Sequence, residues 1–65
     1  MPNSELIKKL HAFIREKDKE YQELIELLQA DPPTVPAELF KLKRRIIVLS
    51  HEKSFLIQQA RDLAN

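Results

Sequence analysis

The sequence predicts an all-α fold, an antiparallel two-helix hairpin whose helices cover about residues 4–30 and 36–63. Two observations lead to this prediction. Apolar residues recur at steps of three and four on both sides of one break, which is typical of helices that pack along a seam. The break is rich in proline, whereas glycine is absent from all 65 residues, which disfavours the tight turns of a small β fold.

The first helix is expected to begin near Ser4 and to end near Ala30. Asn3 or Ser4 can cap its start, and Glu5 follows in the first turn, where the helix dipole favours a negative charge. Its apolar seam has one polar interruption, Lys17. The seam consists of Ile7, Leu10, Ile14, Lys17, Tyr21, Leu24 and Leu28, and it is widened at both ends by Leu6, Phe13 and Leu27.

The predicted connection, residues 31–36, holds three prolines in five positions and cannot continue a helix. A connection this short favours antiparallel helices, in a register where facing residue numbers sum to about 67. The two lysines that interrupt the seams, Lys17 and Lys53, then lie near the middle of the hairpin. We expect each to lay its stem along the apolar surface and to place its amine in water, while a role in setting register or oligomeric state stays open.

The second helix is expected to begin at Pro36, which suits the first helical position, with Glu38 in the first turn. It is expected to end near Leu63. Its seam again advances by three and four residues, with one polar interruption. The seam consists of Leu39, Leu42, Ile46, Leu49, Lys53, Leu56, Ala60 and Leu63.

The second helix also carries apolar residues outside its seam. With Ile46 at zero, they lie roughly 100–200° around the helix. These residues, called the outer stripe below, are Phe40, Ile47, Val48 and Phe55. One neighbouring helix cannot cover both stripes, and leaving the outer stripe in water forgoes about 1.5–3 kcal/mol for each large side chain. We therefore expect these four residues to anchor an interface, with scattered exposed apolar residues as the alternative.

What covers the outer stripe stays open between two kinds of partner. Copies of the chain itself would bury it in a four-helix bundle or a similar helical oligomer. A different protein with an amphipathic helix would also bury it. The predicted function is therefore a small protein–protein interaction module that self-associates, or that acts as an adaptor or chaperone for a helical partner.

Composition limits the remaining classes of function. The 65 residues make a single domain, 1–65, and a monomer of this size is expected to be marginally stable. The absence of cysteine excludes disulfides and thiolate metal sites, and the absence of glycine excludes phosphate-binding glycine loops. No run reaches the ~18 apolar residues of a membrane span, and MPNSELIKKL lacks the apolar core of a secretory signal. We therefore expect a cytoplasmic protein with no membrane partner.

The sequence contains no pattern that predicts catalysis or metal binding. His11 and His51 lie several helical turns apart in the predicted register, and neither has a ligand partner at a metal-binding spacing. Ser4, Ser50 and Ser54 lack the glycine-flanked turn that exposes a nucleophilic serine. We therefore expect no enzyme activity, no cofactor and no bound metal.

One basic cluster indicates an alternative function. The cluster consists of Lys41, Lys43, Arg44 and Arg45. Residues 32–65 carry six basic and three acidic residues, a net charge of +3, whereas residues 1–31 carry five and seven, a net charge of −2. This difference favours pairing of the helices, within one chain or between chains. A dimer would enlarge the positive field, so the alternative is an RNA-binding dimeric hairpin. Aromatic residues for base stacking are scarce, which makes nucleic acid the less favoured partner.

The segment LSHEKSFLI, Leu49 to Ile57, resembles the motif of the small sporulation aspartyl-phosphate phosphatases. That family works through an aspartate one turn after the serine, and Ser54 stands at that place here, so the activity is not carried over. In length and architecture, the chain also resembles the plasmid-encoded hairpin that dimerises and binds paired RNA loops, and the hairpin chaperones of type III secretion needle subunits. These resemblances concern the fold and imply little about function.

Overall fold

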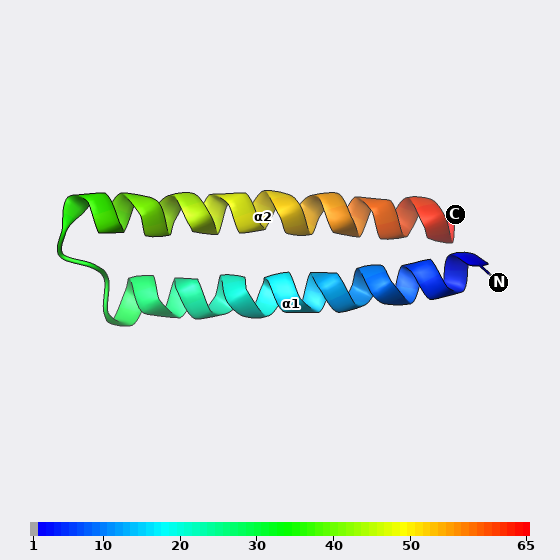
Figure 1. The fold of residues 1–65 in the computed structure, drawn as a ribbon, viewed down its shortest axis with the longest axis horizontal. Helices are drawn as coiled ribbons and strands as arrows, with labels where there is room; N and C mark the ends of the chain where they lie inside the picture. The colour runs from blue at the N-terminus through cyan, green and yellow to red at the C-terminus, as the bar shows by residue number, and fades with distance from the viewer. Residues whose placement is uncertain (1) are drawn as a thin grey trace.

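Two long α-helices joined by a short loop make up the fold, in a computed structural model that describes residues 2–65 (Figure 1). α1 spans Pro2–Ala30 and α2 spans Pro36–Ala64, each with 29 residues. The helices run antiparallel, so the start of α1 and the end of α2 lie together, at the end of the molecule opposite the loop. The predicted hairpin is therefore confirmed. Of the predicted domain, 1–65, Met1 lies outside the described residues.

The start of α1 differs from the prediction. The first helical residue is Pro2, so Asn3 and Ser4 both lie within the first turn, and the prediction that one of them caps the helix is wrong. Proline suits the first helical position because its φ angle is already helical and the N–H group that it lacks would have no partner there. Glu5 lies in the first turn, as predicted.

α2 begins at Pro36, as predicted, and ends one residue beyond the predicted end. The preceding residue, Val35, has an extended backbone with φ −78° and ψ 124°. Its carbonyl accepts a 3.0 Å hydrogen bond from the N–H of Leu39, which closes the first turn of the helix. The extended conformation of Val35 follows from its place before a proline, where the helical region is disfavoured.

The loop between the helices turns without glycine. At the end of α1, the N–H of Asp31 donates a 2.9 Å hydrogen bond to the carbonyl of Leu27. None of the described residues adopts a positive φ angle, so no position in the loop requires the conformational freedom of glycine. Proline and extended residues make the turn instead, which explains how a chain without glycine forms a hairpin.

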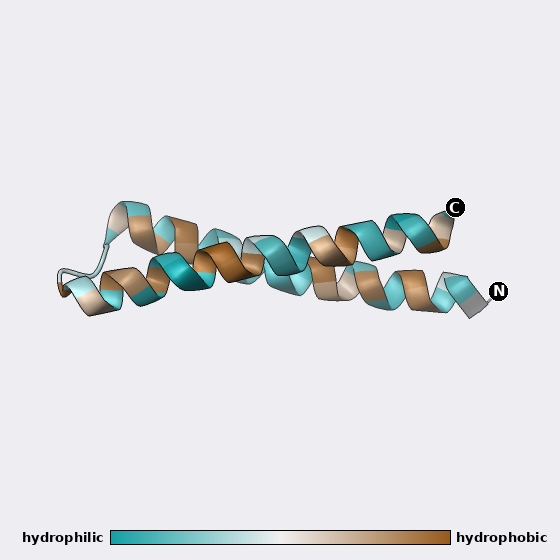
Figure 2. Ribbon diagram, turned by 90° about the horizontal axis from the view of Figure 1, so that it is seen from above, coloured by the Kyte–Doolittle hydropathy of each residue, from teal (hydrophilic) through white to brown (hydrophobic). Residues whose placement is uncertain are grey.

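A narrow apolar core lies along the line where the helices meet. The buried residues are Leu10, Leu42, Ile46, Leu49 and Ala60. All five belong to the predicted seams. Among the described residues only Leu49 is fully buried, at 0% exposure. The other described seam residues are half-buried, because each seam is covered by one helix only. Seen from above, the helices cross, and a broad apolar band lies in the loop-proximal half of α2 (Figure 2).

Two ion pairs cross the middle of the hairpin. The amine Nζ of Lys17 lies 2.6 Å from Oε2 of Glu52, and the amine Nζ of Lys53 lies 2.6 Å from Oδ1 of Asp18. The side chains of Lys17 and Lys53 stay 31% and 20% exposed, and the sequence analysis did not predict that their amines pair with carboxylates of the opposite helix. Each lysine has a carboxylate as its direct neighbour in the sequence, and antiparallel packing sets each lysine against the carboxylate of the opposite helix.

Arg45 extends this charged layer towards the loop, where its Nη2 lies 3.1 Å from Oε1 of Glu20. In the three closest ion pairs the residue numbers sum to 65, 69 and 71, near the predicted 67. The hydrogen bond from Lys53 holds the pKa of the Asp18 carboxyl below its ordinary value. The hydrogen bond from Lys17 does the same for the pKa of Glu52.

Candidate functional site

Exposed apolar side chains outnumber buried ones on this hairpin. Among the described residues, nine large apolar side chains are exposed, whereas the five buried residues include one alanine. The exposed ones are Leu6, Phe13, Leu27, Val35, Phe40, Ile47, Val48, Phe55 and Ile57. Several of them gather in the hollows described below, and gathered exposed apolar residues are a mark of an interaction surface.

All four residues of the predicted outer stripe are exposed. Phe40 is 68% exposed, Phe55 64%, Ile47 57% and Val48 39%. They lie on the part of α2 that α1 does not cover, because they stand far around the helix from the buried seam. Their predicted position outside the seam is confirmed, while an interface at this position stays a prediction.

Three residues of the outer stripe line a hollow on the loop-proximal half of α2, called the outer groove below. Phe40, Ile47 and Val48 form it together with Lys43 and Arg44, and its volume is about 430 Å³. These positions follow one another at helical spacing, so they share one face of α2. The outer groove therefore combines an apolar floor with basic groups, and it is large enough to accept an aromatic side chain.

Phe55 lies in a different hollow, called the lateral groove below, to which α1 also contributes. Phe13 of α1 lines it together with Phe55 and Leu56 of α2, and its volume is about 240 Å³. The ion pair between Lys17 and Glu52 borders it. The structure thus divides the outer stripe between two hollows, one on α2 alone and one that spans both helices.

Phe13 lines the lateral groove, whereas the sequence analysis places it at the edge of the seam of α1. Leu6, Phe13 and Leu27 are predicted to widen the seam of α1, but all three are exposed. Each directly precedes a seam residue, and they are separated by seven and fourteen residues, which places them in one row on the flank of the helix. The seam repeats at the same interval, so the signal in the sequence that sets these residues apart is their offset of one position, about 100° around the helix.

The structure does not gather the four basic residues into one site. Arg45 is held beside α1 by its ion pair with Glu20, and it also lies 3.9 Å from a carboxylate oxygen of Glu52 on its own helix. Lys41, Lys43 and Arg44 are exposed, and within residues 2–65 none of them forms an ion pair. Two of these three cations line the outer groove. The basic cluster therefore lies beside the apolar surface of α2, and three of its four cations have no ion partner among residues 2–65.

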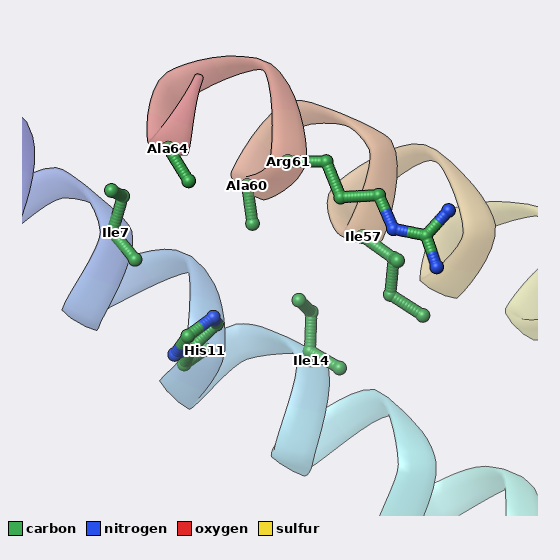
Figure 3. A pocket seen from close by; sticks show the side chains of 7 residues that line it. All are labelled: Ile7, His11, Ile14, Ile57, Ala60, Arg61 and Ala64. Atoms are coloured by element: carbon green, nitrogen blue, oxygen red, sulfur yellow. The ribbon is translucent and has the colours of Figure 1, made fainter.

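A third hollow lies between the helices at the end opposite the loop (Figure 3). Ile14 points from α1 towards α2, and Ala60 and Ala64 point back from α2 into the space. The two alanines stand one helical turn apart and are too short to fill it, which leaves a volume of about 390 Å³. His11 and Arg61 complete the lining with two further isoleucines, Ile7 and Ile57.

These hollows offer surfaces for binding, with few groups that could do chemistry. His11 lines the third hollow, whereas His51 stands exposed on the other helix. Across the described part of the chain, no three histidine or acidic side chains converge on a point where a metal ion could be held. Neither α1 nor α2 is long and apolar enough to cross a membrane.

The fold and its surface define a small α-helical hairpin with a large exposed apolar area. The chain matches no protein-family model, and it matches no curated protein and no solved structure.

Proposed function

We propose that this chain is a small protein–protein interaction module that works as a homodimer, in which the α2 helices of two hairpins bury their outer stripes in a four-helix assembly. The observation that carries the proposal is the exposure of the outer stripe beside a core that holds five buried residues in the part of the chain that the structure describes. The alternative partner is a different helical protein, for which the chain would act as an adaptor or chaperone.

Energetics support self-association. A chain of this length buries only about 60% of the surface that it exposes when unfolded, so a monomer has a small margin of stability. Burying a large apolar side chain contributes about 1.5–3 kcal/mol. The four outer-stripe side chains are between 39% and 68% exposed, so only about half of that amount remains to be gained at each of them. Together they would add about 3–7 kcal/mol per copy, which reaches the lower end of the whole stability of a small domain, about 5–15 kcal/mol. The contact that makes the chain a dimer would then also stabilise each hairpin.

Sedimentation and light scattering over a range of protein concentrations test this proposal. The wild type is expected to form a dimer. The variant with Phe40→Glu and Ile47→Glu is expected to be monomeric and less helical, because two charges would have to be buried in the interface. The matched control carries Gln22→Glu and Gln29→Glu, two exposed positions on α1 with the same spacing of seven residues. It is expected to remain dimeric.

A wild-type chain that stays a folded monomer at high concentration would contradict the homodimer. The foreign helical partner would then become the leading interpretation. A variant that dimerises as well as the control would show that the outer stripe is not the interface, even if the wild type is a dimer.

A further inference from the structure

We propose that two copies of the chain pack α2 against α2 in antiparallel orientation, with a two-fold axis between residues 47 and 48. This inference rests on the proposed function, because it specifies the geometry of the homodimer. It is carried by the positions of the four outer-stripe residues along α2, by the two grooves and by the distribution of charge.

The outer stripe is symmetric about one point of α2. Residue numbers 40 and 55 sum to 95, and so do 47 and 48. A two-fold interface requires that if residue i of one copy contacts residue j of the other, j also contacts i. In an antiparallel pair centred between residues 47 and 48, Phe40 of one copy faces Phe55 of the other, and Ile47 faces Val48. All four apolar residues then meet apolar residues of the second copy.

The two grooves fit this arrangement. Phe55 of the second copy lies opposite Phe40 and reaches the outer groove. This groove has a volume of about 430 Å³ and is lined by residues of α2 alone. Phe40 of the second copy lies opposite Phe55 and reaches the lateral groove of about 240 Å³, which Phe13 also lines. Each aromatic side chain thus finds a hollow in the other copy, and α1 takes part in the interface through Phe13.

Charge favours the antiparallel orientation over the parallel one. Residues 36–47 of α2 contain four basic residues and one acidic residue, a net charge of +3, whereas residues 48–64 contain two of each, a net charge of 0. A parallel pair would set the two basic segments side by side, which costs energy because like charges repel. The antiparallel pair sets each basic segment against the neutral half of the other helix.

One facing pair in this geometry is unfavourable, and it supplies a test. Arg44 and His51 are both exposed and lie between the two apolar pairs. Their residue numbers also sum to 95, so Arg44 of one copy faces His51 of the other. Replacing His51 by Glu would give each arginine an acidic partner. In a parallel pair, the same substitution would set Glu against Glu. His51→Glu is therefore expected to tighten an antiparallel dimer and to weaken a parallel one.

The first experiment measures the dissociation constant of His51→Glu by sedimentation equilibrium. We expect tighter dimerisation, with a dissociation constant lowered roughly three- to tenfold, because the symmetry creates the new ion pair twice. His51→Gln is the uncharged control and is expected to change it little. An increase in the dissociation constant for His51→Glu, or no change, would overturn the antiparallel register.

The second experiment uses disulfide cross-linking, for which a chain without cysteine provides a clean background. Arg44→Cys and His51→Cys are prepared as separate proteins, oxidised alone and as a mixture, and the products are identified by mass. A disulfide between position 44 of one copy and position 51 of the other is expected in the mixture. Each variant alone is expected to cross-link poorly, since identical positions lie about seven residues, or 10 Å, apart along the axis.

The other outcomes separate this inference from the proposed function. Efficient cross-linking of each variant with itself would indicate a parallel pair and overturn the inference. The absence of any disulfide from a protein that sediments as a dimer would place the interface elsewhere, which overturns the register and leaves self-association standing. Sedimentation as a folded monomer would overturn both.

Discussion

Lys53 and Asp18 join the two helices at the middle of the hairpin, with 2.6 Å between Nζ and Oδ1. The same amine lies 4.5 Å from the centre of the Tyr21 ring, where the face of an aromatic ring attracts a cation. With the neighbouring pair of Lys17 and Glu52, this contact places charge in the centre of an otherwise apolar seam. The predictions below concern this layer, the core around it and the surface outside it.

Stability is expected to fall as the pH is lowered through the acidic range. The pKa values of Asp18 and Glu52 are depressed below 3.8 and 4.5 by hydrogen bonds from Lys53 and Lys17. A carboxyl whose folded-state pKa is depressed stabilises the fold above its unfolded-state pKa, and this contribution is lost as the pH falls through the folded-state pKa. Urea unfolding followed by circular dichroism from neutral pH to below pH 3.8 measures the loss.

The control for this pH dependence is the variant with Asp18→Asn and Glu52→Gln. It is expected to be less stable at neutral pH and to depend less on pH below 4.5, because the two linked groups no longer titrate. An unchanged pH profile in this variant would show that other carboxyls produce the effect.

Replacing both seam lysines is expected to raise the free energy of unfolding and to allow more than one oligomeric state. The variant with Lys17→Leu and Lys53→Leu makes both seams continuous, and Asp18 and Glu52 remain solvated because their side chains are well exposed. A gain of roughly 1–3 kcal/mol in the free energy of unfolding is expected from the added burial. Polar seam residues specify register and oligomeric state, so sedimentation is expected to show a mixture of assemblies. A less stable variant would mean that the ion pairs outweigh the burial.

Leu49 and Val48 are neighbours with different expected roles. Leu49 is fully buried against α1, so Leu49→Ala is expected to lower the free energy of unfolding by about 2–5 kcal/mol, most of the stability of so small a fold. Val48 faces away from α1, so Val48→Ala is expected to weaken dimerisation and to change helix content much less. Urea unfolding and sedimentation of both variants, each at matched concentration, separate the two effects. Equal behaviour of the two variants would contradict the division between seam and outer stripe.

Phe13 and Leu6 occupy the same flank of α1 and provide a test of the lateral groove. Phe13→Ala removes a wall of the groove that receives Phe40 of the second copy, so the dissociation constant of the dimer is expected to rise about tenfold or more. Leu6 lies two turns away from Phe13 and lines a separate hollow with Leu10 and Leu63, so Leu6→Ala is expected to leave the dissociation constant nearly unchanged. Sedimentation equilibrium measures both. A larger effect at Leu6 would move the interface towards the end opposite the loop.

The periodicity of apolar residues is sufficient to predict the hairpin and its core. A seam that advances by three and four residues defines one face of each helix, so Leu42, Ile46 and Leu49 can be recognised as buried before any contact is known. The exposure of Phe40 and Ile47 follows from the same rotation, since a hairpin has one seam on each helix.

Other features depend on how the two helices are placed, which periodicity does not determine. Lys17 and Lys53 are visible as interruptions, but their ion partners depend on the register to within one residue. Phe13 adjoins the seam in rotation, and whether such a residue is covered depends on the distance between the helices. The start of α1 depends on local backbone preferences, where Pro2 takes the first position ahead of the polar residues that follow it.

The placement of the start of α1 next to the end of α2, opposite a loop that needs no glycine, has a consequence for protein engineering. A circular permutant that links the original ends through a short flexible peptide and opens the chain at Thr34 would keep both helices uninterrupted. Its connection would then lie at the far end of the molecule, while the seam and the exposed face of α2 keep their geometry. Such a molecule would separate what the proline-rich turn contributes to assembly from what the helices contribute.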